Sequence, residues 1–299
     1  MPWNALVQIV QPHAPRAKTG CPPLAIKTML RIYYLQQWFG LSDPAVEELL
    51  HDVPPYKLHR EFAGLGDGVS RLPDETTFLR FRHLLEAHDL AIDMLRVVND
   101  ILQAKGLLLR IGTAVDATLI AAPSSTKNAE GKRAPQMHRT RKGKQWYFGM
   151  KAHIGVDAQS GLVHTVVGTA ANVSDPNVAG ALLHGEEHAA FGDAGYQGVN
   201  KRAEAQGPIW HVAMRRGKRR KLNEFIEPQF LAERAEKMKA SIRAKVEHSF
   251  CVIKNLFRHR KTRYMGLTKN TVQLLSLFGL ANLVIANRSL LETHVRGAS

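Results

Sequence analysis

Apolar residues in the first third of the chain recur every three or four positions, which is the spacing of amphipathic helices. Helix-boundary signals accompany this pattern: Gly40 ends one helix, and Asp43 before Pro44 begins the next. The pattern therefore predicts a compact helical region, with helices over 24–39, from 42, from 73 and over 90–105. We expect 1–20 to be an arm without well-specified structure and 51–68 to be a connection rich in proline and glycine.

The helix that begins near residue 73 is predicted to have one apolar and one basic face. Its spacing turns Phe78, Phe81, Leu84 and Leu85 inward and Arg80, Arg82 and His83 outward. Helix–turn–helix modules offer a basic helix of this kind to the major groove, which makes Arg80 and Arg82 candidate DNA contacts. Plain helical packing produces the same pattern, so both interpretations stay open.

After the fourth helix the pattern changes to short runs of apolar and β-branched residues, which are typical of strands. A strand is predicted within 107–120, and a regular pleat places Asp116 on one face with Ala114, Thr118 and Ile120. Aspartate is disfavoured inside strands. Asp116 therefore either faces water on an edge strand or has a function.

Two more strands, 147–156 and 162–169, are predicted to form a hairpin, in which Asp157 serves the turn. The preceding segment, 121–144, is expected to be a polar, basic loop, either solvated or in contact with phosphate. A helix capped by Asp175 should follow over 172–183.

The next segment contains two exposed glutamates, Glu186 and Glu187, and then a short strand that ends at Asp193. Small residues surround Asp193, which would let a ligand or another backbone approach it closely. A further short strand is predicted over 209–214.

The last third of the chain begins with a basic run that contains six cations in seven residues. Such runs contact phosphates or stay solvated, and we favour phosphate contact here. The candidate DNA contacts in the run are Arg215, Arg216, Lys218, Arg219, Arg220 and Lys221. A charged helical connection over 224–238, a helix over 238–257 and an apolar, buried helix over 268–286 are expected to follow.

The helix over 238–257 has an apolar stripe with polar residues along its edge. Helical geometry at about 100° per residue gathers Arg243, Glu247 and Lys254 within about 40° of one another. A surface ion pair on an amphipathic helix would explain this grouping. Two upstream aspartates, Asp116 and Asp193, make a functional grouping the better interpretation.

Composition supports a polyanionic partner. The 299 residues have a formal net charge of +15 and a pI near 10.0, which favours nucleic acid over a membrane surface. No apolar run is long and uniform enough to span a bilayer, and no signal peptide is recognised at the start. The two cysteines cannot form a disulfide framework or a cysteine zinc site, which fits a reducing cytosol.

Asp116, Asp193 and Glu247 would come from two strands and one helix. Carboxylates that face one another without a cation repel, so such a grouping implies a metal ion or raised pKa values. Mg²⁺ prefers oxygen ligands, and a pair of ions can activate both the attacking and the leaving oxygen of a phosphodiester. The sequence therefore predicts metal-dependent phosphodiester chemistry.

The chain resembles DDE transposases of bacterial insertion sequences, in the insertion-sequence-four/five group, over nearly its whole length. Several segments carry the resemblance together, and any one of them alone would be weak evidence. They are Val115–Thr118, Pro123–Lys127, Lys151–Asp157, Ala170–Asn172, Gly192–Gly198 and the Arg243-x3-Glu247-x6-Lys254 pattern.

The resemblance implies an α/β fold: an RNase H-like mixed sheet flanked by helices over 106–290, after an all-helical DNA-end-binding domain over 1–105 and before a tail over 291–299. It implies that Asp116, Asp193 and Glu247 are catalytic and hold Mg²⁺, with Mn²⁺ able to substitute. Arg243 and Lys254 match the basic residues of the family's glutamate helix.

The implied function is DNA transposition: binding of double-stranded terminal inverted repeats, phosphodiester hydrolysis and strand transfer into target DNA. A homodimer or larger assembly in the bacterial cytoplasm is expected. Two departures, Ala240 in place of the family's tyrosine and a 133–138 loop without its acidic residues, motivate an alternative, a catalytically inactive DNA-binding protein or repressor. A nuclease without strand transfer is a third possibility.

Overall fold

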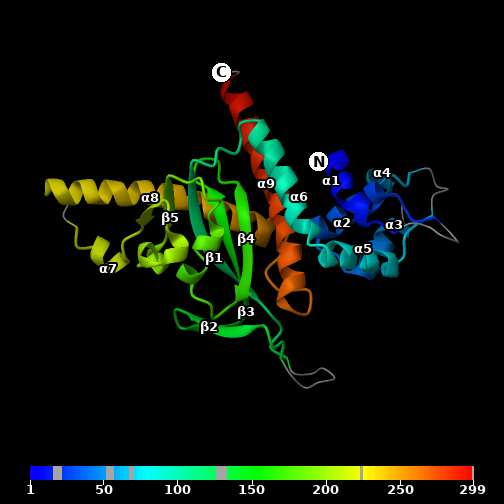
Figure 1. The fold of residues 1–299 in the computed structure, drawn as a ribbon, viewed down its shortest axis with the longest axis horizontal. Helices are drawn as coiled ribbons and strands as arrows, with labels where there is room; N and C mark the ends of the chain where they lie inside the picture. Colours follow the sequence, from blue (N-terminus) through cyan, green and yellow to red (C-terminus); the bar gives the residue numbers. More distant parts are fainter. Residues whose placement is uncertain (16–21, 52–56, 67–70, 126–132, 223–224, 298–299) are drawn as a thin grey trace.

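The computed structural model describes the chain except for residues 16–21, 52–56, 67–70, 126–132, 223–224 and 298–299, and side chains are described only up to residue 290. Two of the predicted features therefore lie partly or wholly outside the described residues: the end of the Pro123–Lys127 segment and the side chains of the 291–299 tail. The described part of the chain is a helical region followed by a mixed sheet with helices packed on it (Figure 1).

The helical region contains two helices that the sequence analysis missed. Its elements are α1 (Trp3–Val10), α2 (Ile26–Phe39), α3 (Asp43–His51), α4 (Lys57–Ala63), α5 (Glu75–Ala87) and α6 (Leu90–Ala104). The prediction of an unstructured arm over 1–20 is wrong for α1, whose Leu6 and Val10 are fully buried. The short apolar stripe of α1 was not recognised as a helix because prolines and cations follow it closely in the sequence. The 51–68 connection likewise contains α4.

Helix α5 corrects the predicted orientation of Arg82. The side chain is buried and donates to Asp43 Oδ1 at 2.7 Å and Oδ2 at 3.1 Å. Its guanidinium carbon also lies 4.5 Å from the centre of the Tyr264 ring. Residue 82 follows Phe78 by one helical turn, so it shares the inward stripe. Arg80 is exposed, as predicted, and Arg82 is a core ion-pair residue instead of a DNA contact.

We expect Arg82→Met to lower the free energy of unfolding by about 3 kcal/mol, because it leaves the partly buried carboxylate of Asp43 without its partner. Arg80→Met on the same helix should change it by less than about 0.5 kcal/mol, since that side chain is exposed. Urea unfolding of both variants measures the difference. Equal destabilisation would contradict the buried ion pair.

Within the described residues, six strands form one mixed sheet in the order β2–β3–β1–β5–β6, with β4 also paired to β3. β1 is antiparallel to β3 and parallel to β5, and β5 is parallel to β6. The strands are β1 (Gly112–Ala121), β2 (His138–Lys142), β3 (Gln145–Asp157), β4 (Val163–Ala170), β5 (Ala189–Gly192) and β6 (Ile209–Val212). The predicted α/β class with a mixed sheet after a helical region is confirmed, and it is consistent with an RNase H-like DDE domain.

The predicted hairpin is present as β3 and β4. Asp157 serves its turn, because the carboxylate accepts from the backbone N–H and hydroxyl of Ser160 at 2.7 and 2.6 Å. The predicted loop over 121–144 is wrong for 138–142, which pairs with the start of β3 as β2. Most β2 side chains are exposed and polar, so the strand lacks the apolar alternation by which strands are recognised.

One face of the sheet is covered by long helices and the other by short 3-10 turns. Helices α6, α8 (Glu227–Cys251) and α9 (Leu267–Gly297) pack on the first face, and α8 extends beyond the sheet as an arm (Figure 1). The predicted 172–183 helix is replaced on the second face by turns at Asp175–Asn177 and Gly180–Leu182. Asp175 does not cap a helix, because its Oδ1 accepts from Lys151 Nζ at 2.8 Å.

Helix α8 runs without interruption from Glu227 to Cys251. The sequence predicted a charged helical connection over 224–238 and a separate helix over 238–257. A π-helical segment at Val252–Leu256 follows α8 directly. Helix α9 is the predicted apolar helix. Leu267–Leu290 is long and apolar enough for a membrane span, but 78% of its apolar window is buried inside the fold, as expected of a core helix.

The helical region and the sheet share one apolar core. Asn282 on α9 donates to Asn99 Oδ1 on α6 at 2.8 Å and to the carbonyl of Val163 at 2.7 Å. Tyr33 on α2 bonds to Ser276 on α9 at 2.8 Å. Packing therefore continues across residue 105, and the functional boundary at 105/106 stays a prediction.

Candidate active site

The register of the sheet brings the two aspartates together. β1 and β5 run parallel with Ala114 opposite Phe191, and β5 ends at Gly192. Asp116 and Asp193 each follow this last paired position by two residues, so they lie at the same end of the two strands. The two aspartates, 77 positions apart in the sequence, are thus brought to one region where β5 ends.

Helix α8 supplies the third acid on the same face of the sheet. Val246 and Phe250 are buried in the apolar cluster that contains Ala114 and Ile120 of β1. Side chains of a strand alternate between faces, so Asp116 lies on the face that α8 covers. Glu247 follows Val246 and is exposed beside this contact.

The pKa of Asp116 is raised to about 7, chiefly by burial and also by the charges of Asp193 and Glu247, against the opposing hydrogen bond from the Ala117 N–H. Arg243 acts in the opposite direction by stabilising the ionised form. Charge effects weaken with distance, so Asp193, Glu247 and Arg243 belong to the surroundings of Asp116. Asp116 is a half-buried member of a mixed group of acids and one arginine.

Asp193 stands in a tight turn. Its Oδ1 accepts from the Gly195 N–H at 2.7 Å. A Cβ atom at residue 195 would lie 2.8 Å from the same oxygen, so the turn needs glycine there. The small neighbours that drew attention to Asp193 in the sequence therefore fix its carboxylate.

Two cations flank the acids on the α8 side. Lys254 lies in the π-helical segment and donates to the hydroxyl of Thr118, which shares a face with Asp116. Burial and then the nearby Lys142 lower the pKa of Lys254, against the opposing charge of Glu247. Arg243 Nε is buried and, among the described residues, has no hydrogen-bond partner. A π-turn often marks a functional position in a helix.

The donor set fits a divalent ion with hard oxygen ligands. Three carboxylates converge, and Asp116 does not ionise fully at neutral pH without a compensating cation. Among the described residues, one group of three His, Cys, Asp or Glu residues has its ligand atoms all within 4.8 Å of one another. That group does not include Asp116, Asp193 or Glu247. The ligand atoms of Asp116, Asp193 and Glu247 therefore do not all lie within that distance of one another in this structure.

The predicted DNA contacts of the basic run lie away from the acids in the fold. Four residues of the run form α7 (Arg216–Arg219), which lies beside the α8 arm in Figure 1. Arg219 is already paired, because its guanidinium donates twice to Glu233 at 2.6 and 2.9 Å. The exposed members are Arg215, Arg216, Lys218, Arg220 and Lys221.

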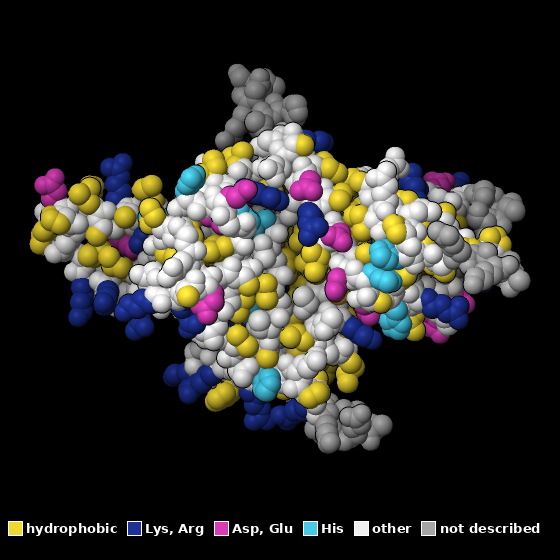
Figure 2. Space-filling model, viewed as in Figure 1, with side chains coloured by type: hydrophobic (Ala, Val, Ile, Leu, Met, Phe, Trp, Pro, Cys, Tyr) yellow, Lys and Arg dark blue, Asp and Glu magenta, His cyan; other side chains and the backbone are white. Residues whose placement is uncertain are grey.

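A second basic surface lies on the β2–β3 hairpin, within the segment predicted as a basic loop. Figure 2 shows Lys and Arg gathered at that end of the molecule and under the α8 arm. The exposed cations of the hairpin are Arg139, Arg141, Lys142 and Lys144. The charge of Lys142 also lowers the pKa of Lys254. This basic surface therefore extends toward the cation that flanks the acids.

Comparison with known families agrees with this arrangement. Residues 1–84 match the model described as a transposase domain (DUF772). Residues 108–283, which contain Asp116, Asp193 and Glu247, match the model described as the transposase DDE domain. No solved structure matches the chain. Because the second match covers more than half of the sequence, the chain belongs to the DDE transposases of insertion sequences.

Proposed function

We propose that this protein moves an insertion sequence by binding its terminal inverted repeats, hydrolysing a phosphodiester at each end and transferring the freed 3′-OH to target DNA. The observation that carries the proposal is the convergence of Asp116, Asp193 and Glu247 with Arg243 beside them. The family match adds support for transposase chemistry on DNA.

Asp116, Asp193 and Glu247 would hold Mg²⁺, or Mn²⁺ in its place, and the metal would supply Lewis-acid activation of the attacking and leaving oxygens. A cation there would favour the ionised form of Asp116, whose pKa is raised by burial and like charge. Arg243 and Lys254 would neutralise the phosphate and offset the repulsion between the DNA backbone and the acids.

The protein binds double-stranded DNA as a dimer or larger assembly, because two ends must be cut and joined together. Its net charge of +15 favours binding to a polyanion such as DNA. The exposed cations on the hairpin and beside the α8 arm provide phosphate contacts on two sides of the acids. It acts in the bacterial cytoplasm, on the nucleoid.

We expect the double variant Arg216→Ala/Lys218→Ala to weaken binding of an inverted-repeat duplex. Each lost phosphate contact should reduce the slope of log K against log salt by about 0.9, or about 1.8 for both. Arg288→Ala, at an exposed position on α9 outside the predicted DNA-binding surfaces, should leave the slope unchanged. Fluorescence anisotropy in EDTA at several salt concentrations measures the slopes, and equal slopes for all proteins would remove the basic run from the interface.

The test of the proposal uses paired DNA ends taken from the borders of the protein's own element. With Mg²⁺, the protein should nick each end and join the 3′-OH to a target plasmid. Binding that is equal with and without Mg²⁺, and never followed by nicking, would support the inactive DNA-binding alternative. Nicking without joined products would support a nuclease.

A further inference from the structure

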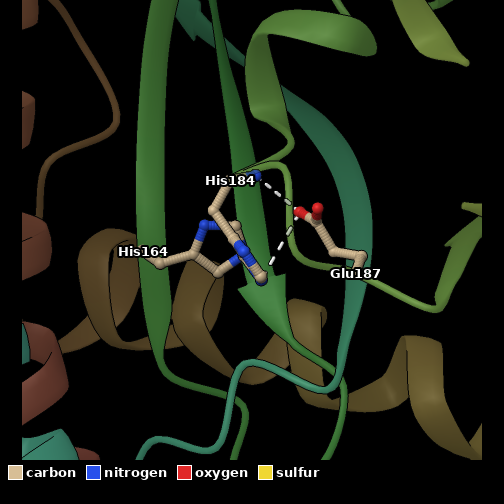
Figure 3. Close-up of side chains that lie close together, drawn as sticks. All are labelled: His164, His184 and Glu187. Carbon is tan, nitrogen blue, oxygen red and sulfur yellow. Dashed lines mark hydrogen bonds and ion pairs between the residues drawn. The ribbon is translucent and has the colours of Figure 1, made fainter. Parts of the chain in front are cut away.

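A compact polar cluster lies on the opposite face of β1 from the candidate active site. Figure 3 shows His164 from β4 with His184 and Glu187 from the segment that leads into β5. One ligand atom from each of the three lies within 4.8 Å of the other two. Glu187 was expected to be exposed, but its side chain is 1% exposed because it turns inward.

We propose that His164, His184 and Glu187 form a second metal site that takes a divalent transition ion such as Zn²⁺. Two imidazoles and one carboxylate are a ligand set that zinc accepts, with a fourth position open to water. Mg²⁺ prefers all-oxygen surroundings, so the site would discriminate between the two ions. The inference uses none of the residues on which the proposed function depends.

The carboxylate is held in place by fixed donors. Glu187 accepts from the backbone N–H groups of His184 at 2.6 Å and Gly185 at 2.8 Å. The hydroxyl of Thr113 donates to Glu187 Oε1 at 2.9 Å and lies 3.0 Å from His164 Nε2. Bonds of this kind orient metal ligands from outside the coordination sphere.

His164 can present Nε2 to a metal ion once its ring proton moves to Nδ1. Thr113 donates its one hydroxyl proton to Glu187, so in the metal-free chain it accepts from His164 Nε2–H at 3.0 Å. Nδ1 lies 2.9 Å from the hydroxyl of Thr165, which can accept a proton held there and leave Nε2 free for the ion.

His184 is the least satisfied member of the cluster. Its Nε2 is buried and, within the described residues, makes no hydrogen bond, while Glu187 Oε1 is 3.5 Å away. Nδ1 accepts a long bond of 3.3 Å from the Glu186 N–H, so without metal the ring proton sits on Nε2. When an ion binds Nε2, the ring proton would move to Nδ1, and the cost would be the long hydrogen bond that Nδ1 accepts from the Glu186 N–H.

A bound ion would connect three segments that the backbone leaves separate: β4, the connection before β5 and, through Thr113, the start of β1. The start of β1 pairs with β5, the strand that leads to Asp193. Metal binding should therefore stabilise the fold beneath the candidate active site without contributing to its chemistry.

The experiment titrates chelator-treated full-length protein with Zn²⁺ against a chromophoric chelator, in excess Mg²⁺ that occupies the acids of the candidate active site. We expect one Zn²⁺ per chain and a higher melting temperature. His184→Gln and Glu187→Gln should weaken binding by more than about 10-fold. The neighbouring exposed residues provide matched controls, because His188→Gln and Glu186→Gln should bind as the unaltered protein does.

Substitution of Co²⁺ gives an independent measurement on the unaltered chain. Two imidazole ligands in a four-coordinate site produce strong visible absorption, whereas oxygen ligands at the acids do not. The proposal is overturned if the folded, unaltered protein binds Zn²⁺ only nonspecifically, at the background level of the titration. It is also overturned if His184→Gln and Glu187→Gln fold and retain full affinity. DNA cleavage in Mg²⁺ reports on the proposed function separately.

Discussion

Replacement of Asp116 by Asn, Asp193 by Asn or Glu247 by Gln should each reduce the rate of DNA end cleavage by roughly 1,000-fold or more. Each change keeps the size of the side chain and removes one anionic ligand from the group around Asp116. Cleavage that depends on a metal pair needs all three acids, so the three losses should be similar and not additive. Gel analysis of single-turnover cleavage in Mg²⁺ measures the rates.

The control for these variants is Glu186→Gln, which also neutralises an exposed carboxylate but lies outside the candidate active site. It should cleave at the unaltered rate. All four proteins should still bind the inverted-repeat duplex, and the three active-site variants should bind it slightly more tightly because they carry one negative charge fewer. Full cleavage activity in any of those three would remove that acid from the mechanism.

The sequence predicted the central elements of the site because each has a strong local signal. An aspartate inside a β-branched strand, an aspartate among glycines and a glutamate between two cations stand out from their surroundings. The strand that carries Asp116, the β3–β4 hairpin and the apolar helix α9 were likewise predicted from their patterns. Their meeting in space depends on sheet register, which only the fold supplies.

The features that sequence reasoning missed depend on contacts between distant segments. Arg82 was assigned to the surface because it is charged, yet its partner Asp43 lies 39 residues away. The cluster of His164, His184 and Glu187 has no characteristic spacing, so nothing local indicates it. Strand β2 was missed because its pairing with β3 is on a largely exposed hairpin without an apolar face.

In the metal-free protein, Asp116 should contribute a loss of stability as pH rises, and Asp116→Asn should remove that contribution. The pKa of Asp116 is about 7 in the fold, against 3.8 for an ordinary aspartate. At this group the folded chain therefore binds more protons than the unfolded chain between about pH 4 and pH 7, and the group's contribution to stability falls across that window. Above pH 7 the cost is complete and reaches up to about 4 kcal/mol.

Subtraction of the two pH profiles isolates this carboxyl group. Buried histidines such as His153 and His259, whose pKa values burial lowers to about 4, act in the opposite direction, but they do so equally in both proteins. The Asn side chain can still accept the hydrogen bond from the Ala117 N–H. The variant should match the unaltered protein near pH 4 and exceed its free energy of unfolding by up to about 4 kcal/mol at pH 8 in EDTA.

Addition of Mg²⁺ should reverse most of this difference, because a cation among the three acids stabilises the ionised form of Asp116 in the unaltered protein. The variant has one anionic ligand fewer and should gain less. Urea unfolding at pH 4, 6 and 8, with EDTA or Mg²⁺, provides the comparison. Parallel pH profiles in EDTA would show that Asp116 is solvated and isolated, and would separate it from Asp193 and Glu247.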